Sequence, residues 1–205
     1  MKKIISLFQR NYEGDKLVRN EVVPGAEWVL AGEGVATRKF DGTCCMIRGG
    51  KLFKRYESKP GIKPPPNFEP ADDTDELTGK RQGWLPIGDG PEDKWHREAF
   101  AHGVALLAPP VLKLFPMPNI VPPLDLTTAS EEHTYELCGP KVQGNPEKLT
   151  EHFLFVHGLC TVECPRDFDG IKAFLVTAGI EGIVWHHPDG RMVKIKRKDF
   201  FRSKP

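Results

Sequence analysis

The sequence predicts an α+β fold, a class in which strands and helices occupy separate stretches of the chain. Short runs of β-branched and apolar residues separated by glycines fill residues 28–56, which is typical of an antiparallel meander. Apolar residues recur at helical spacing at 92–107 and 167–177. Residues 182–185 and 192–195 are two further strand candidates around a Pro-Asp-Gly turn. Together these patterns indicate antiparallel strands accompanied by a few helices.

Length and charge limit what the chain can be. Its 205 residues suffice for one domain with a substantial core. With a formal net charge of +1, a polyanion would have to bind to a local basic patch rather than to the field of the whole molecule. Residues 1–8 are basic and then apolar, but the apolar run is shorter than the roughly 7–15 residues of a signal core, and no stretch approaches the ~20 apolar residues of a membrane span. We expect a cytoplasmic monomer with no membrane segment.

The five cysteines do not indicate a disulfide framework or a zinc site. Cys44 and Cys45 are adjacent, so on a strand they would face opposite ways. Cys160 and Cys164 lack a second cysteine or histidine pair at the spacing of a zinc site. We therefore expect reduced thiols that are mostly buried.

The first part of the chain is expected to consist of strands. Two short apolar pieces, 4–8 and 17–23, precede the meander. Within the meander we predict strands at 28–31, 35–39, 43–48 and 52–56. Asp41-Gly42 lies between the second and third of these strands, so we predict that it forms a hairpin turn.

The remainder alternates between irregular and regular stretches. Residues 57–91 contain many prolines and no sustained period, which predicts an extended loop or insertion, acting as a substrate lid or as a plain surface excursion. The helix at 92–107 and a proline-rich connector at 109–123 follow. We then expect strands at 134–138 and 153–157, and a helix over 167–177 ended by Gly179.

Three lysines are candidates for chemistry on phosphates. Lys39 ends a predicted strand, where a lysine can be a nucleophile if neighbours or desolvation lower its ordinary pKa of about 10.4; in a surface hairpin it would only be solvated. Lys194 and Lys196 are two apart on a predicted strand, so both project to one side. They are a phosphate cradle if a ligand binds there and a solvated sheet face if none does.

Two glutamates are candidate binding residues. Glu181 is expected on the strand beside Lys194, where it would bind a metal or hold a lysine. Glu136, within Tyr-Glu-Leu-Cys-Gly-Pro, is placed like a binding carboxylate at the rim of a sheet. A simple edge-strand acid is the alternative for Glu136.

In this order the motifs resemble those of the covalent nucleotidyltransferase superfamily, which joins polynucleotide ligases with RNA capping enzymes. The resemblance is carried by four segments: Lys39-Phe40-Asp41-Gly42, Tyr135-Glu136-Leu137, Glu181-Gly182-Ile183-Val184 and Lys194-Ile195-Lys196. With Thr43-Cys44-Cys45, Lys54-Arg55-Tyr56 and residues 83–87 and 93–100, the chain is more closely similar to the small vertebrate-type 5′-to-3′ RNA ligase family, over residues 30–200. That family consists of ATP-dependent RNA ligases.

The resemblance implies a fold. It implies a nucleotidyltransferase domain of the ATP-grasp-like, ligase adenylation type, with two antiparallel β-sheets flanked by helices and the nucleotide between them. We expect a single domain over residues 1–205, with residues 57–91 as an insertion. Only nine residues follow Lys196, so we expect no C-terminal oligonucleotide-binding (OB) domain, which DNA ligases and capping enzymes use to orient pyrophosphate and to grip duplex.

The resemblance also implies a mechanism. The neutral amine of Lys39 would attack the α-phosphorus of ATP, releasing pyrophosphate and leaving a lysyl-AMP. Lys194, Lys196 and Mg²⁺, with Mn²⁺ as an alternative, would depress the pKa of Lys39 and neutralise the phosphate oxygens. AMP would then pass to an RNA 5′-phosphate, and an RNA 3′-hydroxyl would displace it and seal the strand.

Site roles follow from the same resemblance. Catalysis would involve Lys39, Asp41, Glu181, Lys194 and Lys196. The ATP contacts would come from Thr37, Lys39, Arg55, Glu136, Phe155, Lys194 and Lys196. Glu136 would accept from the ribose hydroxyl, and Glu136 and Glu181 would bind the metal. Asp41 would steer the 3′-hydroxyl step or only fix the turn. Phe155 would stack on the purine, with Phe153 as the other candidate, or belong to the core.

We therefore expect an ATP-dependent RNA ligase that acts on 5′-phosphate and 3′-hydroxyl RNA ends in RNA repair or processing. An RNA-capping-type guanylyltransferase would load GTP instead. A non-catalytic nucleotide- or RNA-binding module would bind without a covalent adduct. A basic tail would follow the RNA phosphates or be a solvated terminus; it consists of Lys196, Arg197, Lys198, Arg202 and Lys204.

Overall fold

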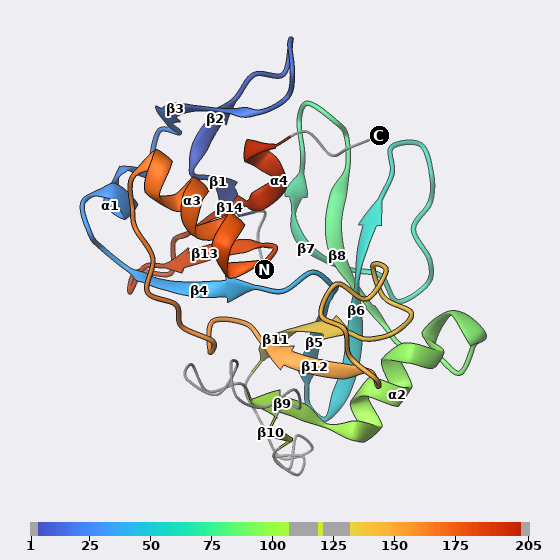
Figure 1. Cartoon of the computed structure of the whole chain (residues 1–205). Coiled ribbons are helices and arrows are strands. Elements are labelled where there is room, and N and C mark those ends of the chain that lie inside the picture. The colour runs from blue at the N-terminus through green and yellow to red at the C-terminus, as the bar shows by residue number, and fades with distance from the viewer. Residues whose placement is uncertain (1–3, 107–118, 121–131, 202–205) are drawn as a thin grey trace. The chain divides into compact units, whose positions relative to one another are not determined.

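The computed structural model describes residues 4–106, 119–120 and 132–201 (Figure 1). The chain forms two compact units. The first, here the four-stranded unit, comprises Ile4–Phe40 and Gly158–Pro205; the second, the eight-stranded unit, contains Asp41–His157. Each unit has its own sheet and its own apolar core.

A mixed sheet forms the centre of the four-stranded unit. Its strands, in spatial order, are β1 (Ile5–Ser6), β14 (Met192–Lys196), β13 (Gly182–His186) and β4 (Val35–Lys39). β13 pairs antiparallel with both β14 and β4, and β1 pairs parallel with β14. A separate two-stranded ribbon consists of β2 (Phe8–Arg10) and β3 (Val18–Val22).

Helix α3 (Phe168–Ala178) lies beside this sheet (Figure 1), and its apolar side chains belong to the core of the unit. Its Ile171 and Leu175 are fully buried in the same cluster as Ile183 of β13 and Ile195 of β14. The Asp167 side chain caps the helix by accepting from the N–H of Gly170, and the left-handed Gly179 ends it. Two short helices, α1 (Glu27–Leu30) and α4 (Arg197–Phe200), complete the unit.

The eight-stranded unit is built on a longer sheet. Its order is β10 (Asn119–Ile120), β9 (Val104–Leu106), β12 (Phe153–Val156), β11 (His133–Cys138), β5 (Thr43–Arg48), β6 (Lys51–Ser58), β8 (Arg81–Pro86) and β7 (Glu69–Thr74). Neighbours pair antiparallel except β12 and β9, which are parallel. The short 3₁₀ helix η1 (Pro91–Asp93) leads into α2 (Lys94–His102).

Side chains alternate between the two faces of this sheet, as the pleat of a strand requires. One face carries a core with α2, in which Cys45, Tyr135 and Leu137 cluster with Ala99 of the helix. The other face carries a smaller apolar cluster of Met46, Phe53 and Trp84, against which Cys44 packs. Consecutive residues of β5 therefore belong to different layers.

Most of the predicted elements are confirmed, and the α+β class with them. The strands at 35–39, 43–48 and 52–56 correspond to β4, β5 and β6, and those at 134–138 and 153–157 to β11 and β12. The helix at 167–177 is α3, and the last two strands are β13 and β14. Among the described residues, no helix is both long and apolar enough to cross a bilayer.

The predicted hairpin across Asp41-Gly42 is wrong. β4 pairs with β13 in one unit, whereas β5 pairs with β11 and β6 in the other, so Asp41 and Gly42 lie on the connection between two sheets. A glycine turn between two apolar runs indicates a hairpin only when the runs are each other's partners. The meander is accordingly restricted to β5 and β6, and the sheets are mixed rather than purely antiparallel.

Three other local predictions need correction. Residues 28–31 lie largely in helix α1, not in a strand. The stretch 57–91 is not a continuous loop, because it contains β7 and β8; Pro70 is tolerated since β7 is an edge strand with an irregular register. The predicted helix at 92–107 ends at His102 and β9 follows, while its residue 107 and most of the connector at 109–123 lie outside the described residues.

Candidate active site

Lys39 and Lys196 flank the same residue of the central strand in the four-stranded unit. Gly182 of β13 is opposite Lys39 on β4 and opposite Lys196 on β14. Residues directly across a sheet share a face, so the two lysines project to one side. A Cβ at Gly182 would lie 2.2 Å from the carbonyl oxygen of Ile195, which explains why glycine occupies the middle of this row.

Glu181 joins the two lysines. Its Oε2 lies 2.6 Å from Nζ of Lys39, and its Oε1 lies 3.0 Å from Nζ of Lys196. The Glu181 side chain is 10% exposed, so both ion pairs are largely shielded from solvent. Nζ of Lys39 also donates to the carbonyl oxygen of Phe40, at 3.1 Å. The carboxylate thus holds two amines from strands on opposite sides of β13.

Lys194 lies on the same face of the sheet, two residues before Lys196 on β14. Val184 of β13 is opposite both Lys194 and Thr37, and residues two apart on a strand point the same way. The expectation that Lys194 and Lys196 share a face is confirmed. Burial, followed by the positive charges of Lys196 and Lys39, lowers the pKa of Lys194 to about 8.

Thr37 is buried and engaged within its own sheet. Its hydroxyl donates to the carbonyl oxygen of Val184 at 3.1 Å and lies 3.0 Å from Nε2 of His186. These contacts connect β4 to β13 through side chains as well as through backbone hydrogen bonds. The Thr37 hydroxyl thus helps to hold β4, the strand that carries Lys39, against β13.

Asp199, which the sequence patterns did not single out, anchors the end of β14. Its Oδ2 accepts from the backbone N–H of Lys196 at 2.9 Å, and its carboxylate pairs with Arg10. Asp199 is buried, and it belongs to α4, which begins directly after Lys196. The backbone at Lys196 is therefore held by a carboxylate while its side chain is held by Glu181.

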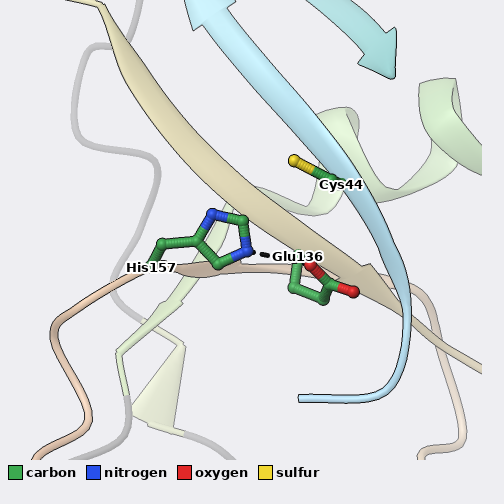
Figure 2. A group of neighbouring side chains, drawn as sticks. All are labelled: Cys44, Glu136 and His157. Atoms are coloured by element: carbon green, nitrogen blue, oxygen red, sulfur yellow. Dashed lines mark hydrogen bonds and ion pairs between the residues drawn. The ribbon is translucent and has the colours of Figure 1, made fainter. Parts of the chain in front are cut away.

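A second group of polar side chains surrounds Glu136 in the eight-stranded unit (Figure 2). Glu136 is 8% exposed. Its Oε1 accepts from the backbone N–H of Gly42 at 3.1 Å, and its Oε2 lies 2.8 Å from Nε2 of His157. A Cβ at Gly42 would lie 2.1 Å from the carbonyl oxygen of Leu137, so glycine permits this close approach.

The other residues expected at the site are distributed over this unit. Phe155 is buried on β12 opposite Glu136. Nε of Arg55 donates to Oε1 of Gln82 at 3.1 Å, and its guanidinium lies 5.3 Å from the centroid of the Trp84 ring. The neighbouring Lys54 pairs with buried Asp93 at 2.6 Å. Asp41 lies on the connection between β4 and β5.

Two of the residues near Glu136 were not predicted as site residues. Cys44 is the direct partner of Glu136 across β5 and β11, and His157 follows β12. Glu136 lies on a strand that the sequence predicts, but its neighbours in space depend on which strands pair. No spacing in the sequence contains that information.

The comparisons with known proteins identify the family. A family model described as RNA ligase 1 matches residues 67–205. This chain belongs to the RNA ligase 1 family. The expected relation to an RNA ligase family is confirmed. The matched segment of this RNA ligase 1 family member contains Glu136, Glu181, Lys194 and Lys196 and begins after Lys39.

Curated relatives of this RNA ligase 1 family member bear the same description. The RNA ligase 1 of Mus musculus is 29% identical, over 80% of this chain and 65% of its own length. That of Rattus norvegicus is 28% identical over 80% of this chain and 66% of its own length. That of Danio rerio is 26% identical over 79% of this chain and 66% of its own length. The chain thus spans just under two thirds of the length of these relatives.

Proposed function

We propose that this chain is an ATP-dependent RNA ligase that joins 5′-phosphate and 3′-hydroxyl RNA ends through a covalent lysyl-AMP. The observation that carries the proposal is the position of three residues far apart in sequence. Lys39, Glu181 and Lys196 meet through two ion pairs on one face of a sheet, with Lys194 one row away. A nucleophilic amine, a carboxylate and two phosphate-binding cations form the set that nucleotidyl transfer to lysine requires.

Lys39 is the proposed nucleophile. Its amine must be neutral to attack, and Glu181, 2.6 Å away, is placed to accept the proton that it gives up. The attack forms a bond between Nζ and the α-phosphorus and breaks the bond from that phosphorus to the leaving pyrophosphate. AMP then remains on Lys39 as a phosphoramidate.

Lys194 and Lys196 are proposed to bind the phosphates. They share a face with Lys39, and Lys194 is partly buried. Charge spreads over the equatorial phosphate oxygens in the transition state, so fixed cations shielded from water stabilise that state strongly. The same cations favour the neutral form of a neighbouring amine.

Glu181 is also the residue of this unit that would bind Mg²⁺, or Mn²⁺ in its place. Each of its carboxylate oxygens accepts from one lysine and retains a further lone pair. In proteins, Mg²⁺ is often bound by one carboxylate together with substrate phosphates and water, so Glu181 fits the ion. When bound, the ion would neutralise phosphate charge.

The face of the eight-stranded sheet that carries Glu136 is proposed to bind the nucleoside. Glu136 would accept from the ribose, and Phe155, its cross-strand partner, would contact the purine. Arg55, on β6 over Trp84, would contact ribose or phosphate. These roles correspond to the nucleotidyltransferase fold that we propose for the chain, including Asp41 as the residue that steers the 3′-hydroxyl.

The RNA steps follow the adenylylation. AMP would pass from Lys39 to an RNA 5′-phosphate, which forms a 5′–5′ pyrophosphate linkage and regenerates the amine. An RNA 3′-hydroxyl would then attack the activated 5′-phosphate and release AMP, sealing the strand. The relatives are named RNA ligases, and we extend that activity to this chain.

Intact mass after incubation with ATP and Mg²⁺ tests the proposal. We expect the mass to increase by one AMP in the unmodified chain and in the control Lys51→Ala, which removes an exposed lysine of β6. The Lys39→Ala variant should acquire no AMP. An adduct that persists in Lys39→Ala would exclude Lys39 as the nucleophile.

The same assay separates the rival functions. Incubation with α-labelled ATP or GTP in parallel should label the chain with ATP, whereas labelling with GTP alone would indicate a guanylyltransferase. A non-catalytic binding module would acquire neither label, and Lys39→Ala would leave its affinity for ATP and RNA largely unchanged.

A further inference from the structure

Cys44, Glu136 and His157 converge on one face of the eight-stranded sheet (Figure 2). Glu136 of β11 is directly opposite Cys44 of β5 and opposite Phe155 of β12. His157 is two residues beyond Phe155, and its backbone N–H donates to the carbonyl oxygen of Thr134 at 3.1 Å. Because side chains two apart on paired strands share a face, the register itself brings the three residues together.

Their ligand atoms are close enough for one ion. One atom from each residue, the thiol sulfur, a carboxylate oxygen and a ring nitrogen, all lie within 4.8 Å of one another. Nε2 of His157 and Oε2 of Glu136 are already 2.8 Å apart. Zinc bonds to sulfur are about 2.3 Å long, and those to nitrogen or oxygen about 2.0–2.2 Å, so small side-chain rotations would enclose an ion between the three atoms.

The atoms that would not bind the ion are held in place. Nδ1 of His157 lies 3.0 Å from Oγ1 of Thr134, and this hydroxyl can accept the proton that Nδ1 carries when Nε2 binds a metal. Oε1 of Glu136 accepts from the N–H of Gly42 at 3.1 Å, which leaves Oε2 to face the histidine. Outer partners of this kind orient ligands in metal sites.

We propose that Cys44, Glu136 and His157 bind a borderline divalent cation of the Zn²⁺ class. A thiolate and an imidazole select Zn²⁺ and its transition-metal neighbours over Mg²⁺, which prefers oxygen ligands alone. Binding releases the thiol proton of Cys44 and places the ion between Nε2 and Oε2. One thiolate, one carboxylate and a doubly charged cation sum to zero charge, which suits a position where Glu136 is 8% exposed. Three protein ligands leave a fourth position open.

The ion would compete with the nucleotide for Glu136; this consequence, unlike the binding itself, rests on the proposed function. Glu136 is the carboxylate proposed to accept from the ribose, and it cannot keep Oε2 for a ribose while the metal takes it. Zn²⁺ at this site would therefore lower the rate of lysyl-AMP formation.

The binding is tested first, in the absence of ATP. The full chain, freed of metal with a chelator, is titrated with Zn²⁺ by calorimetry and with Co²⁺ as a spectroscopic probe, since thiolate ligation gives cobalt a sulfur-to-metal charge-transfer band. We expect one site, with the band lost and the Zn²⁺ affinity lowered at least about tenfold in Cys44→Ser. The matched control is Cys164→Ser, which removes another partly buried thiol; it should keep the charge-transfer band and the Zn²⁺ affinity.

A second variant guards against misfolding. His157→Gln should also weaken Zn²⁺ binding while thermal unfolding stays close to that of the unmodified chain. A band that survives in Cys44→Ser, or equal Zn²⁺ affinity in all variants, would overturn the site. The effect of Zn²⁺ on AMP incorporation is then measured with Mg²⁺ present; zinc binding without any AMP adduct in the unmodified chain would reject the proposed function and leave the metal site standing.

Discussion

At the scale of single residues, the site of the four-stranded unit depends on one carboxylate between two amines. Glu181 offsets part of the charge of two lysines that would otherwise repel each other across β13. Two partly buried ammonium groups without a counter-charge would destabilise the fold, so the acid is needed to hold Lys39 and Lys196 close together. The same acid competes with the proposed phosphates for both amines, and ligand binding must therefore loosen the ion pairs.

We predict that Glu181→Gln slows lysyl-AMP formation about tenfold to hundredfold. The amide keeps the shape of the side chain but loses its charge and its capacity to take the proton of Lys39, and hydrogen bonds to charged groups contribute roughly 1.5–3 kcal/mol. Single-turnover incorporation of labelled AMP measures the rate. Glu33→Gln is the control, because the Glu33 carboxylate pairs with His187 instead. An unchanged or faster rate would show that Glu181 only neutralises charge.

A pH prediction follows from Lys194. Its lowered pKa, about 8, means that it is charged below that pH and becomes neutral as the pH rises through it. A neutral amine binds phosphate poorly, so kcat/KM for ATP in adenylylation should fall above about pH 8. In Lys194→Arg the guanidinium stays protonated, and the decline should move to higher pH. The prediction fails if both proteins decline at the same pH.

The sequence predicted some of these residues better than others. That Lys194 and Lys196 share a face follows from strand periodicity alone, and the register confirms it. The neighbours of Glu136 could not be predicted in this way, because Cys44 and His157 reach it through pairing between three strands. Asp199 was missed because a buried carboxylate after a strand has no distinctive spacing.

At the scale of elements, β13 organises the four-stranded unit. It pairs with β4 and β14, and its Gly182 lies between the two lysines that Glu181 holds. The alternate residues of the strand, Ile183 and Trp185, are fully buried in the core with α3. One face of β13 thus packs into the core, while the other face lies between Lys39 and Lys196.

We predict that Gly182→Ala lowers the free energy of unfolding by about 1–3 kcal/mol, the usual cost of forcing extra atoms into a packed position. The added Cβ would lie 2.2 Å from the carbonyl oxygen of Ile195 and would push β13 away from β14. Chemical denaturation measures the change. The control is Gly88→Ala, where the nearest atom would be 3.8 Å away. If the two variants are equally stable, the backbone of Ile195 does not lie as close to Gly182 as the structure shows.

Strands were predicted well and their partners were not. β4 and β5 were predicted from β-branched and apolar runs at their observed bounds, but their assignment to one hairpin was wrong. Local propensity depends on the residue itself, whereas pairing depends on which other strand offers a matching apolar row. β7 and β8 were missed because both contain a proline: Pro70 lies within the edge strand β7, and Pro86 ends the interior strand β8.

At the scale of the whole molecule, the balance of charge limits how the proposed RNA substrate could be bound. The formal net charge is +1, so long-range attraction is weak and contacts to phosphates must come from local groups. Of the basic tail, Arg202 and Lys204 lie outside the described residues. Arg197 and Lys198 are exposed on α4, directly after Lys196. They are the described members of the tail that can meet an RNA backbone without disturbing the lysine row.

We therefore predict that Arg197→Gln with Lys198→Gln weakens the salt dependence of RNA binding. Each phosphate contact to single-stranded RNA contributes about −0.7 to the slope of log K against log salt, so losing two contacts should make the slope shallower by roughly 1.4. Fluorescence anisotropy with a labelled 5′-phosphorylated RNA over a salt series gives the slope. The matched pair Lys51→Gln with Lys59→Gln removes two exposed lysines of the eight-stranded unit and should leave it unchanged. If the first pair leaves the slope unchanged, α4 is a solvated surface, and the RNA backbone must be bound by other basic residues.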